Sequence, residues 1–279
     1  MHNIKIVTDS AAHLSPNDIN HYHITVMNSP ILINGKVFGY VNKISSEKFM
    51  QMFDDDGRAP IIGEISVEAL THTYDELGAD GSQILSIHLS DTLSNTYKNA
   101  KSAATKSTSQ VTVINSRVTA AGLAYQVMTA AEAIAKGQRM IDVLASMEQV
   151  RDKTKIFFSA PNNSQLVNRR VIGKIRGTIE KRLNVSYVIE FKNNDFSFVT
   201  RSRQDELVNQ FWHDQLTIMH HEPIVQLSIL HSGNPDRANF LYQMLSKEFP
   251  FVPISKIPTN PEMACFIGNE ATGVTYLLG

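Results

Sequence analysis

Short runs of apolar residues alternate with stretches of helical periodicity through the first half of the chain. Each run has the length of a strand and is followed by a polar turn and then by a segment whose apolar residues recur every three or four positions. The strands predicted here are Ile4–Val7, Ile24–Val26, Ile31–Ile33, Gln83–Leu89 and Val111–Ile114. Strand–helix–strand units of this spacing predict right-handed crossovers and a mainly parallel sheet with helices on both faces.

Residues with strong capping or turn preferences mark where several of these elements begin and end. Ser15 followed by Pro16 is typical of a helix start, and Ser66 is placed to cap a helix that runs through Leu77. Asn34-Gly35 favours a tight hairpin turn. Gly137 follows a long alanine-rich stretch and is typical of the position just after a helix.

The pattern changes near Lys155, where strands come to dominate. A hairpin around Asn193-Asn194 is expected, with a helix from Gln204 to Met219 and another beginning near Pro235. The predicted strands are Ile156–Phe158, Tyr187–Phe191, Phe196–Thr200, Ile224–Leu230, Val252–Ile257 and Thr275–Leu278. A hairpin among α/β units predicts a second α/β domain with a mixed sheet, so we expect domains at residues 1–160 and 161–279.

Composition and charge narrow the class of protein. Apolar residues make up 42% of the 279 residues, enough for two cores, and 26 basic side chains nearly balance 27 acidic ones. No overall field therefore favours nucleic acid, and no apolar run is long enough to insert stably in a membrane. The single cysteine, Cys265, and an N-terminus that leads straight into a strand favour a cytoplasmic protein.

Small polar residues follow three of the predicted strands. They are Asp9 and Ser10, the segment Ser90–Ser94, and Asn115 with Ser116. Ligands of open parallel sheets bind outside the carboxyl ends of the strands, and the start of the helix after Ser94 favours an anion such as a carboxylate. A cap of that helix is the alternative role of Ser94.

Other polar residues could have either a functional or a purely structural role. Asp9 is either a catalytic carboxylate or a turn former, and Arg170 either neutralises a ligand carboxylate or faces solvent. His231, at the end of a strand, is a further candidate for a polar role in a ligand site. The ten histidines form no ordered set of metal ligands, and no phosphate-binding or dinucleotide motif is present, so neither a metal nor a cofactor is expected.

Several ordered segments resemble the motifs of the DegV family. The stretch from Val7 to Ser15 resembles its opening strand and T-D-S-x-A-x-L signature, and Leu93–Ala100 resembles L-S-G-T-Y-Q-S-A. Val113–Ser116 is similar to V-I-D-S, Arg170-Val171 falls at the family's G-G-R-I, and Ile229–Pro235 parallels I-x-H-x-x-N-P. The matches span nearly the whole chain.

The resemblance implies a two-domain α/β protein that holds a long-chain fatty acid with its head group near the interdomain cleft. Similar proteins are the fatty-acid-binding subunits of bacterial fatty acid kinase, which present the acid to a separate kinase and are not enzymes by themselves. Their head-group contacts are a serine, a threonine, an arginine and a histidine. Ser94 and Arg170 match, whereas Ile62 stands at the threonine position and Phe266 at the histidine position.

Three hypotheses follow. The first is a fatty-acid carrier with Ser94 and Arg170 at the carboxylate, alongside Asp9, Ser10, Ser116 and His231 as further lining residues. The second is a divergent paralogue that binds a neutral or different lipid and does not partner with a kinase, because Ile62 and Phe266 make the head-group end more apolar. The third is a hydrolase or phosphotransferase using Asp9 and Ser10, for which the sequence offers no base or metal set.

Overall fold

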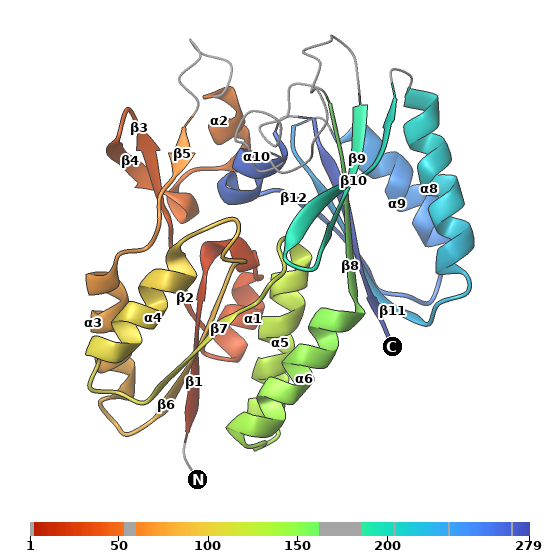
Figure 1. Ribbon diagram of the computed structural model, residues 1–279. Coiled ribbons are helices and arrows are strands. Elements are labelled where there is room, and N and C mark those ends of the chain that lie inside the picture. The colour runs from red at the N-terminus through yellow and green to blue at the C-terminus, as the bar shows by residue number, and fades with distance from the viewer. Residues whose placement is uncertain (1–2, 53–59, 162–185, 203–204, 234, 269) are drawn as a thin grey trace. The chain divides into compact units, whose positions relative to one another are not determined.

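The computed structural model describes residues 3–52, 60–161, 186–202, 205–233, 235–268 and 270–279 (Figure 1). The chain divides into two compact units, Met1–Lys43 with Pro60–Asp152 and Ile44–Ala59 with Lys153–Gly279. This division differs in two respects from a single cut at residue 160. The second unit begins a few residues earlier, and it also takes a short segment from the N-terminal half of the chain.

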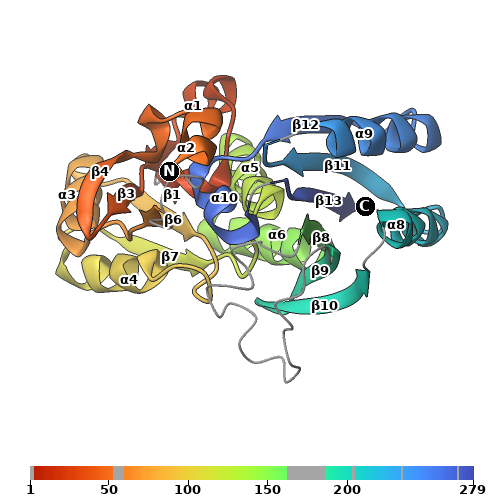
Figure 2. The ribbon, with the colours of Figure 1, turned by 90° about the horizontal axis from the view of Figure 1, so that it is seen from above.

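The first unit is built on a parallel sheet in the order β2-β1-β6-β7, as its sequence pattern predicts (Figures 1 and 2). Its strands are β1 (Ile4–Asp9), β2 (Thr25–Met27), β6 (Gln83–His88) and β7 (Val111–Asn115). Its helices are α1 (Pro16–His21), α3 (Val67–Gly78), α4 (Thr96–Lys106), α5 (Ala121–Ala135) and α6 (Met140–Lys153), with short 3₁₀ turns η1 (Ser10–Ala12) and η2 (Val41–Lys43).

Helices cover both faces of this sheet because successive strand residues point to opposite sides. Val7 and Ile84 pack on one face against Leu70 and Tyr74 of α3 and against the alanines of α4. The other face of β1 is covered by α5. The side chain of Ser15 caps α1 and that of Ser66 caps α3, each accepting a hydrogen bond from the amide three residues on, which confirms both predicted starts.

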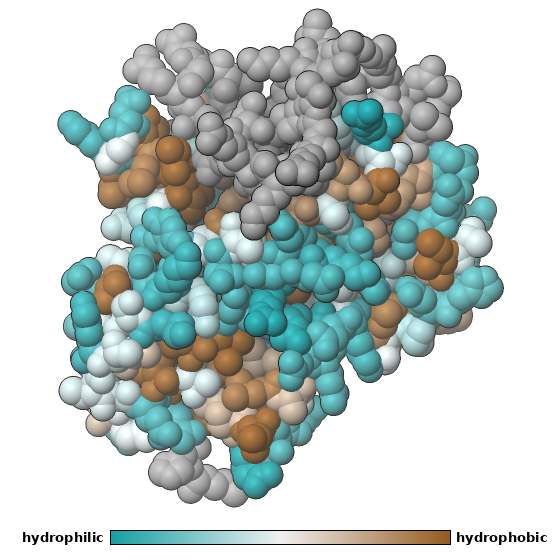
Figure 3. Space-filling model, viewed as in Figure 1, coloured by the Kyte–Doolittle hydropathy of each residue, from teal (hydrophilic) through white to brown (hydrophobic). Residues whose placement is uncertain are grey.

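A small antiparallel sheet, β4-β3-β5, is attached to the first unit. Its strands are β3 (Pro30–Ile33), β4 (Lys36–Tyr40) and β5 (Ile61–Ile62). Asn34 and Gly35 both have positive φ, the geometry of the predicted hairpin turn. Val37, Phe38, Tyr40 and Ile61 are exposed, so apolar side chains gather on the surface over this sheet (Figure 3).

The second unit contains a six-stranded mixed sheet, β10-β9-β8-β13-β11-β12. Its strands are β8 (Thr154–Pro161), β9 (Ser186–Lys192), β10 (Asp195–Ser202), β11 (Ile224–His231), β12 (Ile254–Pro258) and β13 (Thr272–Leu278). Asn193 and Asn194 form the turn of the predicted hairpin, both at positive φ. Among the strands that the structure describes in this unit, only β11 and β12 are paired in parallel; the other neighbours are antiparallel.

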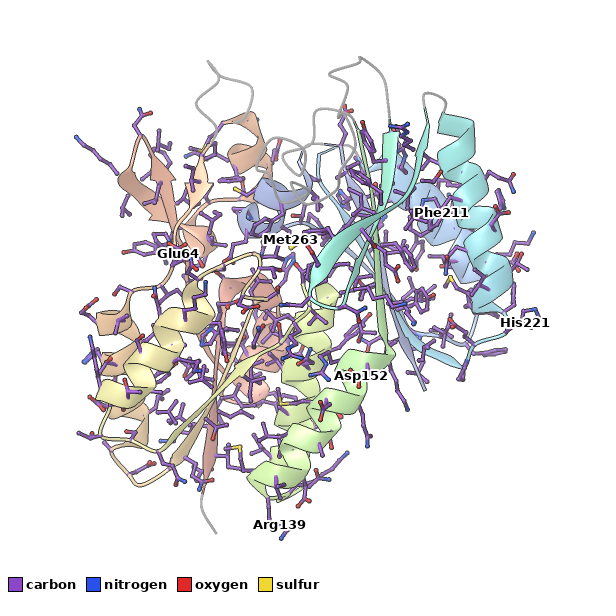
Figure 4. All side chains as sticks on the ribbon, in the orientation of Figure 1. Glu64, Arg139, Asp152, Phe211, His221 and Met263 are labelled. Atoms are coloured by element: carbon purple, nitrogen blue, oxygen red, sulfur yellow. The ribbon has the colours of Figure 1, made fainter. Side chains whose placement is uncertain are left out.

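The core of the second unit lies between its sheet and two helices, α8 (Asp205–Met219) and α9 (Asp236–Glu248). Phe157 of β8 packs its ring against Phe211 and Trp212 of α8, with centroids 5.7 and 6.5 Å apart. Phe211 lies on the side of α8 that faces the sheet (Figure 4). Two short helices in the described part of this unit, α2 (Ser46–Gln51) and α10 (Pro261–Ile267), pack against each other.

Two helices are absent from the sequence prediction, α6 and α10. The side chains of α10 are buried on every side, so its sequence shows no polar face and no helical period. Its start is nevertheless marked locally. Asn260 accepts a hydrogen bond from the amide of Met263, and Pro261 occupies the first helical position.

Candidate ligand-binding site

Polar side chains collect at the carboxyl ends of β1, β6 and β7 in the first unit. Asp9 is the last residue of β1, and Ser116 directly follows β7. Ser90 lies two residues after the end of β6. The backbone ties these ends together, since the amide of Ser116 donates to His88 and the amide of Ser90 donates to Val118. The three polar strand ends predicted from the sequence therefore lie together at one edge of the sheet.

Ser94 lies at the start of α4, half-buried. Its Oγ accepts a hydrogen bond from the amide of Thr96 at 3.1 Å and donates to Thr96 Oγ1, also at 3.1 Å. Ser94 therefore holds the turn that leads into α4, whereas the N-cap residue is Asn95, whose side chain makes no capping hydrogen bond. The bond from the Thr96 amide occupies one lone pair of the hydroxyl, and a ligand at the positive end of the helix would take the proton that Ser94 gives to Thr96 Oγ1.

The segment after Ile62 is attached to the same helix start. The amide of Ile65 donates to Thr96 Oγ1 at 3.3 Å, and the side chain of Asn99 donates to the carbonyl of Ile65 at 2.9 Å. Glu64 accepts from Asn95 at 3.1 Å and lies beside the small sheet (Figure 4). Ile62 itself is half-buried in β5, paired with Ile31. The connection that carries Ile62 is thus held to the turn that carries Ser94.

Asp9 is part of a buried chain of polar side chains that reaches from β1 to α3. One oxygen, Oδ2, accepts from the amide of Leu89 at 3.0 Å and lies 3.2 Å from His88 Nδ1. His88 Nε2 lies 2.7 Å from Ser86 Oγ, which in turn lies 2.7 Å from the hydroxyl of Tyr74. Burial raises the pKa of Tyr74 to about 12, against a smaller lowering by Ser86, so the phenol stays protonated at neutral pH.

His88 is a residue that the sequence did not single out. It stands 79 positions from Asp9, and no spacing rule links the two. The local signal is only that Ser86 and His88 occupy alternate positions of one strand and so share a face. The other oxygen of Asp9, Oδ1, is buried and has no hydrogen-bond partner among the residues that the structure describes.

Ser10 and Ser116 hold the neighbouring backbone in place. Ser10 Oγ accepts from the amide of Ser29 at 3.2 Å, which joins β1 to the start of the small sheet. Ser116 Oγ donates to the carbonyl of Val118 and shapes the turn that precedes α5. In this turn Arg117 and Ala120 have positive φ, a conformation that side chains with a Cβ adopt rarely.

The remaining candidates belong to the second unit or lie outside the described residues. His231 ends β11, half-buried, and burial lowers its pKa. Phe266 is buried in α10. Arg170 falls within residues 162–185 and lies outside the described part of the chain.

No group of three or more His, Cys, Asp or Glu side chains within the described ranges is arranged to hold a metal ion. None of the helices described has the length and apolar character needed to cross a membrane.

The fold and these strand ends define a two-unit α/β protein with hydroxyl donors and one buried carboxylate at the carboxyl edge of a parallel sheet. The model of the DegV family, described as uncharacterised proteins, matches residues 3–278, and the chain belongs to this family. A DegV domain-containing protein of Streptococcus pneumoniae is 26% identical over 274 residues, which cover 98% of each chain.

Solved structures share the fold over the full length. One is DegV of Bacillus subtilis, described as a fatty acid binding protein, with a TM-score of 0.86 and 18% identity over 100% of both chains. Another is a DegV family protein of Thermus thermophilus, described by its fatty acid binding, with a TM-score of 0.85 and 21% identity over 99% of this chain and 100% of the other.

Proposed function

We propose that this chain binds a long-chain fatty acid, with the carboxylate at Ser94 and the start of α4, and that it is a carrier without catalytic activity of its own. The observation that carries the proposal is its membership of a family in which proteins of the same fold, over the full length, are described as binding fatty acids.

The geometry at Ser94 is compatible with this ligand. A carboxylate accepts hydrogen bonds from a serine hydroxyl and is favoured at the N-terminus of a helix of 11 residues such as α4. The first turn of α4 contains no acidic residue, although the carboxylate of Glu64 lies next to it and accepts from the side chain of Asn95. Arg170 is the proposed cationic partner of the carboxylate, on the strength of its place in the family motif.

Binding tolerates the replacement of two polar head-group positions by Ile62 and Phe266. About fourteen buried methylenes supply roughly 11 kcal/mol at about 0.8 kcal/mol each, before association costs of at least about 4 kcal/mol. Loss of two hydrogen bonds, one of them to a charged group, costs about 3–5 kcal/mol. The tail therefore carries most of the affinity, whereas presentation of the carboxylate to a kinase is the step that these replacements weaken.

For the enzymatic alternative, the structure places a possible general base, His88, next to a serine, but both residues are buried away from any substrate. Ser86, His88 and Asp9 follow one another as in a nucleophilic triad, yet Ser86 and His88 are both 0% exposed and Ser86 Oγ is already bonded to Tyr74. Ser10, the nucleophile of that hypothesis, points its oxygen at the amide of Ser29. A catalytic serine needs an open path to its substrate, so the carrier is the better account.

The proposal is tested first by mass spectrometry of lipid extracted from protein purified under native conditions. We expect a fatty acid in stoichiometric amount. Displacement of a fluorescent fatty acid by saturated acids of eight to eighteen carbons should then give Kd values that fall as the chain lengthens, until the channel is full. Equal affinities from eight to sixteen carbons would contradict a buried acyl chain and with it the carrier.

A further inference from the structure

Strand β7 is the outer strand of the first unit's parallel sheet. It pairs with β6 on one side, and no strand that the structure describes pairs with its other side. All five of its side chains are half-buried. Figure 2 shows β7 outside β1 and β6, and apolar side chains reach the surface below α4, where β7 runs (Figures 1 and 3).

The hydrogen bonds to β6 show which backbone groups of β7 face outward. The carbonyl of Gln110 and the amide of Ser116 both bond to β6. In a parallel pair every second residue turns its N–H and its C=O toward the neighbouring strand, so the even-numbered residues of β7 do so. The N–H and C=O groups of Val111, Val113 and Asn115 therefore point away from the sheet.

The other edge strands that the structure describes are each protected against pairing with another chain. β2 and β5 have only three and two residues, and β12 carries Lys256 and Pro258. The pairings of β4 and β10 with their neighbours are both interrupted by a register shift. Short length, charge, proline and bulges are the usual protections of an edge. β7 has five residues, an unbroken register with β6, and neither charge nor proline.

The strand is complementary to a second copy of itself. Its outward groups are distributed symmetrically about Val113, so a two-fold axis at Val113 lets every one of them pair with the same groups of a second β7 in antiparallel direction. In this register Val113 faces its own equivalent, Thr112 faces Ile114, and Val111 faces Asn115. Most of these are β-branched side chains, which suit cross-strand pairs, and no charged side chains oppose each other.

Charges beyond the ends of the strand are complementary in the same register. Two residues past β7, the exposed Arg117 comes level with Ser109 of the partner subunit. The loop before Ser109 is the one in which Asp75 accepts from Ser107 at 2.6 Å and from the amide of Thr108 at 2.8 Å. The two-fold axis therefore brings a cation to a carboxylate at both ends of the junction.

We infer that two copies of this chain associate through β7, in antiparallel register about Val113, so that their two parallel sheets join into one. The inference concerns the first unit alone and does not depend on the proposed ligand. A junction of five residues and its flanking loops is small for an interface, so the dimer is reversible, with a Kd of about 1–100 µM.

The first test is sedimentation equilibrium of the full chain from about 1 to 300 µM. The mass should rise from the 31.1 kDa of one chain toward twice that value. Val113→Pro should remain a monomer throughout, because proline removes the central outward N–H. The bonds to β6 do not use this N–H, so the variant should still fold, which thermal unfolding checks.

A second variant tests the charges and serves if Val113→Pro does not fold. Arg117→Glu places like charges at both ends of the junction and should raise the Kd of the dimer about fivefold or more at low salt. Lys36→Glu makes the same change of charge at an exposed position of the small sheet and should leave the Kd unchanged.

Cysteine crosslinking tests the register. Thr112 and Ile114 would face each other across a pair without hydrogen bonds, with Cα atoms about 4.5 Å apart, a distance that a disulfide can bridge. The double variant Thr112→Cys with Ile114→Cys should therefore form a covalent dimer under mild oxidation. Thr112→Cys alone should not, because the natural Cys265 is buried.

A wild-type mass of 31.1 kDa over the whole concentration range would overturn the inference. So would a Val113→Pro protein that folds and still dimerises, or equal crosslinking of the single and double cysteine variants. All of these outcomes would leave the proposed binding of fatty acid intact.

Discussion

At the scale of single residues, the pair of Asp9 and His88 shows how a strand end is kept in shape. The carboxylate accepts from the amide of Leu89 and lies against the His88 ring, so it joins the ends of β1 and β6 on the interior side. Burial of such a pair is costly unless its remaining atoms are bonded, and Ser86 with Tyr74 satisfies the far side of the imidazole. We infer that this pair positions the loop that follows β6, which leads to Ser94.

Ser94 and Arg170 are predicted to contribute unequally to the affinity for the ionised acid. Ser94→Ala removes a hydrogen bond between ligand and hydroxyl, so we expect a loss of about 1 kcal/mol, roughly fivefold in Kd. Arg170→Ala removes a charge-assisted contact and should cost about 1.5–3 kcal/mol. Displacement of a fluorescent fatty acid measures both.

Thermal unfolding must accompany the assay because Ser94 also holds the turn before α4 through its bonds with Thr96. Ser102→Ala, an exposed serine on the same helix, is the matched control and should change neither property. An unchanged Kd in Arg170→Ala would make Arg170 a solvent-facing residue, and an unchanged Kd in Ser94→Ala would leave that serine with a structural role alone.

At the scale of elements, α3 and α4 act as a joined pair that supports the site. Their ends are tied at both termini. Asp75 of α3 accepts from the hydroxyl of Ser107 at 2.6 Å and from the amide of Thr108 at 2.8 Å, and these bonds lower its pKa. At the other end the segment before α3 is bonded to Thr96 and Asn99 of α4. A substitution at the start of α3 should therefore also alter the position of the first turn of α4.

The cap of α3 gives a direct measure of this support. Ser66 Oγ accepts from the amide of Ala69 at 3.2 Å, and Ser66→Ala should lower the free energy of unfolding by about 1 kcal/mol. Ser66→Asp keeps an acceptor and adds a favourable charge at the helix start, so it should unfold at the same urea concentration as wild type or higher. Equal midpoints for the alanine and the aspartate variants would show that the cap contributes nothing.

At the scale of the whole molecule, the proposed function makes the balance between tail and head group decide which uses of the bound lipid we expect. If the tail supplies the free energy calculated above, we expect Ile62 and Phe266 at the proposed head-group positions to leave binding intact. We also expect them to reduce the number of donors that hold a carboxylate in one orientation. A separate kinase that phosphorylates the carboxylate depends on that orientation, whereas storage of the lipid does not.

Restoring the family's polar residues should therefore restore phosphorylation of the bound acid by a kinase. We predict that wild type supports little acyl-phosphate formation with a fatty acid kinase and that Ile62→Thr combined with Phe266→His increases both this rate and the affinity for the ionised acid. The double variant should lose about 1–2 kcal/mol of stability, because two partly or fully buried apolar side chains are given up.

The control for this experiment is Ile61→Thr, the same change at the exposed neighbour of Ile62, which should alter none of these properties. Full turnover with the wild-type protein would contradict the prediction, as would a double variant that folds normally and remains inactive.

Local interactions explain why much of the fold follows from the sequence. Ser15 and Ser66 cap their helices through bonds to residues three positions away, and Asn34-Gly35 and Asn193-Asn194 turn their hairpins by their own backbone angles. Such features depend on a few consecutive residues, so a pattern can report them. The parallel sheet and the mixed sheet follow as well, because the strand–helix order restricts how strands can pair.

The candidate site was likewise predictable from the sequence only in part. Polar residues after β1, β6 and β7 could be placed at one edge from sequence because the carboxyl ends of parallel strands meet there. The partner of Asp9 could not, since His88 is 79 residues distant and looks like any strand histidine. Likewise α10 shows no polar face that would reveal it in the sequence. Capping and turns are decided by neighbours in the chain, whereas register and burial are decided by what the folded chain brings alongside.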